Sequence, residues 1–408
     1  MKSKKSKNSF VGNALKDLFD VFRGEFVHVF KDSGVMIIFF FAGILYPLLY
    51  NGIYNNEYVY QIPIAVVDES SSAESREFVR KVNATREVEV AYKCINLEEA
   101  KELFNKRKVN GVIYIPRDYH VKLRNMEQAT ISIYNDMSSF LYYKGLMMAV
   151  NYTMLDESHK IQIERYNSAG VAGEQAEQIV KPIPYNDVVF YNPGNGFTSF
   201  LIPAILVLII HQTLFFGIGM LAGTAREENR HHTLVPEHLR GNGIFRVIIG
   251  KALCYFVIYA AISAYVLGFV PKLFGLPHIG NIWTLFHLLV PFLFATIFFS
   301  MTISVFVKNR ETGLITFLFF TLILLFLSGF SWPRSNMPVF WQYVSYLFPA
   351  THGIQGYIKI NTMAAELRHV RFEYIGLWIQ TGVYFILASG TLLLTLRKEK
   401  NRLETEQD

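Results

Sequence analysis

The 408-residue sequence is short of cysteine and of charge. Its two cysteines, Cys94 and Cys254, cannot build a disulfide framework. Only 18% of the residues are charged, whereas 51% are hydrophobic, and the hydrophobic residues form uninterrupted runs through the second half of the chain. This combination excludes an ordinary soluble domain and is typical of a polytopic membrane protein.

The sequence also lacks a recognisable site for a nucleotide or a metal ion. In the nearest approach to a phosphate-binding loop, Gly243–Lys251, the glycines are too far apart, and Ala252 stands where a Mg²⁺-binding Ser or Thr is required. The adjacent His231 and His232 would point to different faces of a helix, and no cysteine completes a ligand set. We therefore expect no enzyme activity, no metal and no cofactor in this chain. Any ATP and Mg²⁺ would be bound by a partner ATPase subunit.

The predicted spans carry no carboxylate in their interiors, and Glu373 lies at the edge of the last one. A proton- or ion-coupled carrier would be expected to hold a titrating carboxylate in mid-membrane, so this class is disfavoured. His211 and His287 are polar residues inside predicted spans. We predict that they make hydrogen bonds between helices rather than a proton relay.

Apolar runs of about 20 residues are long enough to cross a bilayer. The sequence predicts six such spans, at residues 34–54, 197–222, 247–270, 282–307, 313–330 and 372–396. Basic residues cluster at the ends of the runs, so the net charge of +6 indicates membrane lipid rather than nucleic acid as a partner. Because basic residues are enriched on the cytoplasmic side of membrane proteins, their positions place both termini in the cytoplasm. Residues 1–33 are predicted to form an amphipathic helix on the inner leaflet, and residues 397–408 a cytoplasmic tail.

Residues 55–195 differ in character, because charged residues return and strand-like runs alternate with helical ones. Strands are predicted at residues 62–67, 86–92, 111–115 and 130–134. The serine-rich run after the first strand and Asn96 are predicted helix caps. The fold class is therefore a six-helix membrane protein with an extracytoplasmic α/β domain inserted between helices 1 and 2.

A polar stretch at residues 223–246 separates the second and third predicted spans. It is rich in basic residues, among them Arg226 and Arg230, and is therefore predicted to be a cytoplasmic loop. A loop of this length can hold a short helix. A membrane protein without its own ATPase site needs such an element to receive force.

These features together resemble an ABC-2 type transporter permease, the membrane subunit of an ABC exporter, in the branch with a large extracytoplasmic loop. The polar loop is similar to the family's coupling segment, although His232 and Val235 depart from it. The matching residues are Arg226, Glu227, Thr233, Leu234, Gly250 and Lys251. The resemblance implies that this segment, with Arg226 and Arg230, contacts an ABC ATPase subunit.

A second motif of the family follows the fifth predicted span. Its matching residues include Gly329, Phe330, Pro333, Met337, Pro338, Pro349 and Thr351. The resemblance implies that residues 331–371 form a re-entrant segment that lines or gates an exit on the outer face. It also implies a dimer with a second copy or a paralogue in the inner or plasma membrane, and leaves room for a periplasmic adaptor and an outer-membrane channel.

Two other functions stay open. The chain would be a membrane-anchored receptor or scaffold if the α/β domain were its working part, although six spans exceed what an anchor needs. It would be a secondary carrier if transport followed a proton gradient. A copurifying ATPase would separate the exporter from both.

Overall fold

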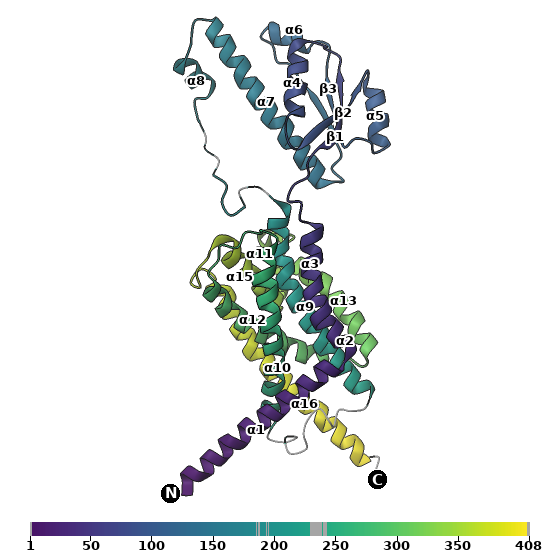
Figure 1. Cartoon of the computed structure of the whole chain (residues 1–408), viewed down its shortest axis with the longest axis vertical. Coiled ribbons are helices and arrows are strands. Elements are labelled where there is room, and N and C mark those ends of the chain that lie inside the picture. The colour runs from purple at the N-terminus through teal and green to yellow at the C-terminus, as the bar shows by residue number, and fades with distance from the viewer. Residues whose placement is uncertain are drawn as a thin grey trace. The chain divides into compact units, whose positions relative to one another are not determined.

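The computed structural model describes residues 2–184, 186, 188–192, 194, 196–228, 239 and 243–405. The chain forms two compact units (Figure 1). A helical unit contains residues 1–55 and 189–408, and an α/β unit contains residues 56–188. The predicted domain at residues 55–195 therefore corresponds to a unit that is slightly shorter at its C-terminal end.

The helical unit is built mainly from long apolar helices. Its elements are α1 Lys2–Lys31, α2 Ser33–Met36, η1 Ile37–Ala42, α3 Gly43–Ile53, α9 Phe197–Glu227, α10 Ile244–Ala264, η4 Tyr265–Phe269, α11 Val270–Leu273, α12 Ile282–Ser304, α13 Arg310–Leu327, η5 Arg334–Asn336, α14 Val339–Ser345, α15 Pro349–Met363 and α16 Arg371–Thr405.

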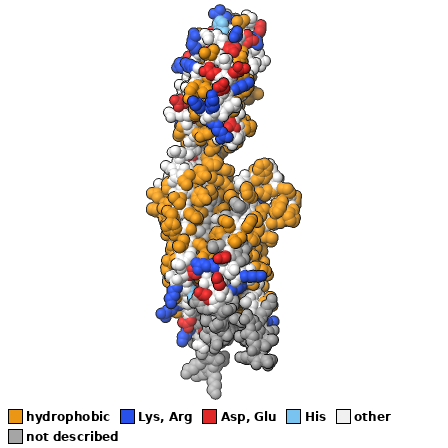
Figure 2. Space-filling model, turned by 90° about the vertical axis from the view of Figure 1, so that its right-hand side faces the viewer, with side chains coloured by type: hydrophobic (Ala, Val, Ile, Leu, Met, Phe, Trp, Pro, Cys, Tyr) orange, Lys and Arg blue, Asp and Glu red, His pale blue; other side chains and the backbone are white. Residues whose placement is uncertain are grey.

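Within the described part of the chain, five helical stretches are long and apolar enough to cross a membrane. They are Ser33–Ile53, Phe197–Glu227, Ile244–Leu273, Ile282–Ser304 and Arg371–Arg397. Hydrophobic side chains cover much of the helical unit in Figure 2, whereas charges of both signs cover the α/β unit. Helix α13 occupies the place of the fifth predicted span, so a sixth crossing stays a prediction.

The boundary between α1 and the first apolar stretch is set by Asp32. Its carboxylate accepts hydrogen bonds from the backbone N–H groups of Gly34 (2.9 Å) and Val35 (3.1 Å) and so caps the start of α2. The amphipathic N-terminal helix and the first apolar stretch are therefore separate elements, as the charge pattern predicts.

Helix α15 is the buried part of the predicted re-entrant segment, and glycines let it approach its neighbours. A Cβ at Gly353 would lie 2.4 Å from the ring of Phe292 on α12, and one at Gly356 would lie 2.8 Å from Leu288. On the α16 side, a Cβ at Gly376 would lie 2.8 Å from the His352 ring. Helix α15 is thus held closely between α12 and α16, as small residues allow in membrane bundles.

The α/β unit contains a four-stranded sheet with the strand order β2-β1-β3-β4. Its elements are β1 Ile62–Asp68, α4 Ala73–Asn83, β2 Val88–Cys94, α5 Leu97–Asn105, β3 Gly111–Ile115, α6 Tyr119–Arg124, β4 Ser132–Asn135, α7 Phe140–Ser168 and α8 Glu174–Val180. Strand β1 pairs in parallel with β2 and β3, and β4 is antiparallel to β3. The four predicted strands are confirmed within two residues.

Alternation along β1 gives the sheet two buried faces. Ile64 and Val66 pack in the cluster with α4 and α7, whereas Ala65 and Val67 pack in the cluster with α5. Both predicted caps are confirmed. Ser72 accepts a hydrogen bond from the backbone N–H of Ser75 at the start of α4, and Asn96 caps α5.

Candidate functional site

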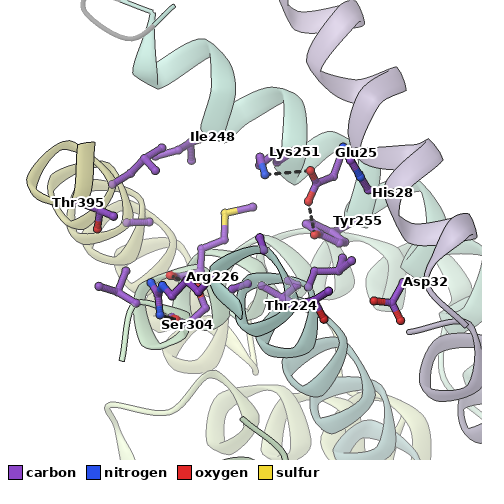
Figure 3. A pocket seen from close by; sticks show the side chains of 18 of the residues that line it. Glu25, His28, Asp32, Thr224, Arg226, Ile248, Lys251, Tyr255, Ser304 and Thr395 are labelled. Atoms are coloured by element: carbon purple, nitrogen blue, oxygen red, sulfur yellow. Dashed lines mark hydrogen bonds and ion pairs between the residues drawn. The ribbon is translucent and has the colours of Figure 1, made fainter. Parts of the chain in front are cut away.

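A cavity of about 480 Å³ lies among the ends of the helices next to the predicted coupling loop. Its walls come from α1, α2, α9, α10, α12, α13 and α16, and they carry both charged and aliphatic side chains. Figure 3 shows Glu25 and Lys251 together and Arg226 on another side of the cavity. Two of the predicted coupling residues therefore line an internal space.

Glu25 is a buried carboxylate in this cavity, with only 7% of its surface exposed. One of its oxygens lies 2.9 Å from the Lys251 ammonium, and the other accepts a hydrogen bond from the Tyr255 hydroxyl. Burial alone would raise the pKa of Glu25, but the charge of Lys251 and these hydrogen bonds outweigh it, so the pKa is lowered. The charged Glu25 therefore stabilises the folded state at neutral pH. This stabilisation is lost as the pH falls below 4.5, the ordinary pKa of a glutamate, and through the lowered pKa of Glu25 in the folded state.

The pair belongs to a longer contact in which α1 docks on α10. On α10, more than one turn before Lys251, the Arg246 side chain lies 2.8 Å from Asp17 of α1. Between the two ion pairs is Gly250, where a Cβ would come within 2.9 Å of Val21. Because the α1 contacts are spaced four residues apart, they share one helix face. Gly250 and Lys251 thus hold α1 against α10, directly after the predicted coupling loop.

Arg226 lies in the last turn of α9 and not in a loop. Helix α9 continues to Glu227, beyond residue 222 where the second predicted span ends, so the predicted coupling segment begins within a helix. The Arg226 guanidinium donates hydrogen bonds to the carbonyls of Ser304 (2.8 Å) and Val307, at the end of α12. The Ser304 carbonyl also accepts a hydrogen bond from the Val307 backbone N–H (3.2 Å), so Arg226 adds a second donor to it and ties the end of α9 to the turn that follows α12.

Glu227 is exposed, and its carboxylate accepts a weak hydrogen bond of 3.4 Å from the backbone N–H of Arg310. The Arg310 side chain in turn lies 3.1 Å from Asp32. The ends of α2, α9 and α13 are linked in this way. Arg230, Thr233 and Leu234, and the short helix predicted in the loop, lie outside the described residues.

The second predicted site lies at the other end of α13. Gly329 has a φ of +73°, which favours glycine, and the Phe330 ring lies 4.9 Å from that of Phe200. Pro333 and Pro338 are exposed and precede η5 and α14. Met337, next to Pro338, is half-buried, whereas Pro349 and Thr351 are buried in the first turn of α15. These residues shape one chain reversal and the start of α15.

We expect Gly329→Ala to destabilise the helical unit by about 2 kcal/mol or more. The left-handed backbone costs a side chain about 1–2 kcal/mol, and a Cβ would lie 2.2 Å from Arg334, which packs over the Tyr346 ring. Gly275→Ala is the matched control, because φ there is +66° and nothing lies within 4 Å. Equal losses of thermal stability in the two variants would contradict the Arg334 contact.

Sequence reasoning missed the buried carboxylates. Besides Glu25, Glu373 is only 5% exposed and lies 2.7 Å from Lys359 of α15. The signal for Glu25 was its spacing of four residues from Val21 and from Val29, both of which are buried. The prediction of a helix on the membrane surface gives Glu25 no role.

The predicted interhelical hydrogen bonds of the two span histidines are wrong. His287 bonds to the Trp283 carbonyl of its own helix at 2.7 Å. His211 is fully buried, and neither ring nitrogen has a hydrogen-bond partner among the described residues. Its neighbours are aromatic rings, those of Phe215 and Phe299 at 6.0 Å. Within the described ranges, no three His, Cys, Asp or Glu residues are placed to hold a metal ion.

Comparison with known proteins agrees with this architecture. Residues 34–389 match the family model described as ABC-2 family transporter protein. The probable multidrug ABC transporter permeases YbhR of Escherichia coli K12 and of Escherichia coli O157:H7 are each 23% identical over 200 residues, 46% of this chain and 54% of the relative. The chain thus spans about half the length of the curated relatives it matches. Because the family match covers most of its residues, this helical membrane protein belongs to the ABC-2 family of transporter permeases.

Proposed function

We propose that the chain is the permease subunit of an ATP-driven exporter, working with a separate ABC ATPase subunit and a second permease copy or paralogue. The family match over residues 34–389 carries this proposal. The name of the relatives makes drug-like molecules the first substrates to screen. The family's second motif lies at a chain reversal before α15, which supports a gating role for residues 331–371.

The contact between α1 and α10 supports the proposed route for force. A push on the segment between α9 and α10 reaches α10 at its first two turns, where Arg246, Gly250 and Lys251 hold α1. The same segment follows the end of α9, which is tied to α12 by Arg226. A movement there would therefore shift several helices together, as a transition between two packed arrangements requires.

The orientation follows from the same proposal. The helix ends that surround the cavity would face the cytoplasm, and both chain termini would lie there too. The α/β unit would lie on the outer side of the inner or plasma membrane. There it would offer a surface to an adaptor or to the exported substrate. A receptor function for the α/β unit is the second candidate, and it predicts full activity without an ATPase.

The test is a mild-detergent pull-down of the tagged chain from its host membranes, with Mg·ATP hydrolysis measured in the eluate. We expect an ABC ATPase to copurify and Glu227→Lys to reduce the bound ATPase several-fold. Glu227 suits this test because its side chain is exposed, so charge reversal leaves the core intact.

Glu366→Lys is the matched control. Glu366 is also exposed and lies in the segment before α16, at the end of that helix opposite to the cavity residue Thr395. We expect its bound ATPase to equal that of the native chain. A native chain that brings down no ATPase would refute the exporter, and equal losses in both variants would refute the assigned face.

A further inference from the structure

Among the described residues, four cations and three carboxylates line the cavity, so its net charge is positive. Glu25 pairs with Lys251, Asp32 pairs with Arg310, and Glu228 is the third carboxylate. Two further cations line the cavity, Lys31 and Arg226, and among the described residues neither contacts a carboxylate. A cavity with unpaired cations and low-dielectric walls concentrates anions.

Arg226 also has hydrogen-bond donors that no described residue uses. A guanidinium has five N–H donors, and the bonds to Ser304 and Val307 both come from Nη1. Nε and Nη2 make no hydrogen bond to any described residue. A guanidinium edge with free donors is well suited to phosphate oxygens. The Thr224 hydroxyl is a second buried group of the cavity without a hydrogen-bond partner within the described ranges, but it lies apart from the guanidinium (Figure 3).

The rest of the wall and the depth of the cavity indicate where the phosphate comes from. Aliphatic side chains of α9, α10 and α16, among them Leu221, Ile248 and Leu392, line the cavity beside the charged groups. The helices of α9 and α12 that are long and apolar enough to cross a membrane end at Glu227 and Ser304, which would place Arg226 near the lipid head groups. A ligand with a phosphate and an acyl chain matches both parts of the wall.

We propose that this cavity is a phosphate-binding site that takes the head group of an anionic membrane phospholipid. Arg226 binds the phosphate through Nε and Nη2, Lys31 adds positive charge to the cavity, and the acyl chain lies along the aliphatic wall. The site belongs to a single chain and needs neither ATP nor a partner, so it is independent of the proposed exporter function and can fail or hold separately from it.

The experiment titrates phosphatidylglycerol into the delipidated full chain in neutral detergent and follows the midpoint of thermal unfolding. Phosphatidylcholine and inorganic phosphate are titrated in parallel. We expect a saturable rise in the midpoint with phosphatidylglycerol, and a half-saturating concentration at least about tenfold higher for Arg226→Gln. Arg23→Gln is the matched control, because Arg23 is an exposed arginine of α1 outside the cavity.

Each arm has a defined meaning. If inorganic phosphate alone gives the same rise, the phosphate site stands and its source is the solution rather than the lipid. If phosphatidylcholine matches phosphatidylglycerol, or if the Arg226 and Arg23 variants lose affinity equally, the proposal is wrong. Should Arg226→Gln fail to fold, Lys31→Gln decides, since its side chain is exposed. We expect a several-fold loss of affinity, and an unchanged affinity would overturn the site.

Discussion

Replacing Lys251 with methionine is expected to destabilise the helical unit by about 3–5 kcal/mol, the cost of removing one partner of a buried ion pair. The variant leaves Glu25, 7% exposed, with the Tyr255 hydroxyl as its one remaining hydrogen-bond partner among the described residues. Docking of α1 on α10 should weaken with it. Thermal unfolding of the purified chain measures the loss, and proteolysis of α1 reports the undocking.

The double variant Glu25→Gln with Lys251→Met separates the charge from the packing. Glutamine can still accept the Tyr255 hydrogen bond, and no buried charge remains, so we expect most of the stability to return. Lys272→Met is the control for losing a lysine, because Lys272 is exposed. A double variant as unstable as the single one would show that the ion pair is not the cause.

The pH dependence should change sign in the single variant. In the native chain the lowered pKa of Glu25 makes stability fall as the pH drops below 4.5. Without Lys251, burial raises the pKa, so the folded state binds the proton more tightly than the unfolded state does. Stability of Lys251→Met relative to the native chain should therefore increase as the pH falls through the raised pKa towards 4.5. An unchanged difference between the two would exclude a buried charged Glu25.

Elements specified by local patterns were predictable from the sequence. The β1 strand is rich in β-branched residues and ends before Ser72, and that serine caps the next helix through a contact only three residues long. Apolar length alone located the five stretches that can span a membrane. In each of these the relevant interactions lie within a few residues, so composition and spacing are sufficient.

The site was predictable only in part, because its contacts join distant segments. The family motif marked Gly250 and Lys251, but their partners Val21 and Glu25 lie in a helix far away in the sequence. The end of α9 was placed too early because Arg226 was interpreted as a loop cation. Its bonds to the α12 carbonyls, which extend the helix into the site, depend on tertiary packing and have no local signature.

Replacing Gly353 with leucine should have the second large effect, about 3 kcal/mol, at the upper end of the costs of overpacking. The new Cβ would lie 2.4 Å from two atoms of the Phe292 ring, which is itself only 2% exposed and has little room to move. We expect α15 to separate from α12, and, if residues 331–371 gate an exit, transport should fall with it.

Gly382→Leu in α16 is the matched control, since nothing lies within 4 Å of a Cβ there. Both substitutions gain the same helix propensity over glycine, so the difference between them isolates the contact with Phe292. We expect the control to be at least as stable as the native chain in thermal unfolding. The double variant Gly353→Leu with Phe292→Ala should recover part of the lost stability, because removing the Phe292 ring leaves room for the leucine side chain. A loss that is the same with and without Phe292 would place the cause elsewhere, because only a clash with this ring can be relieved by removing it.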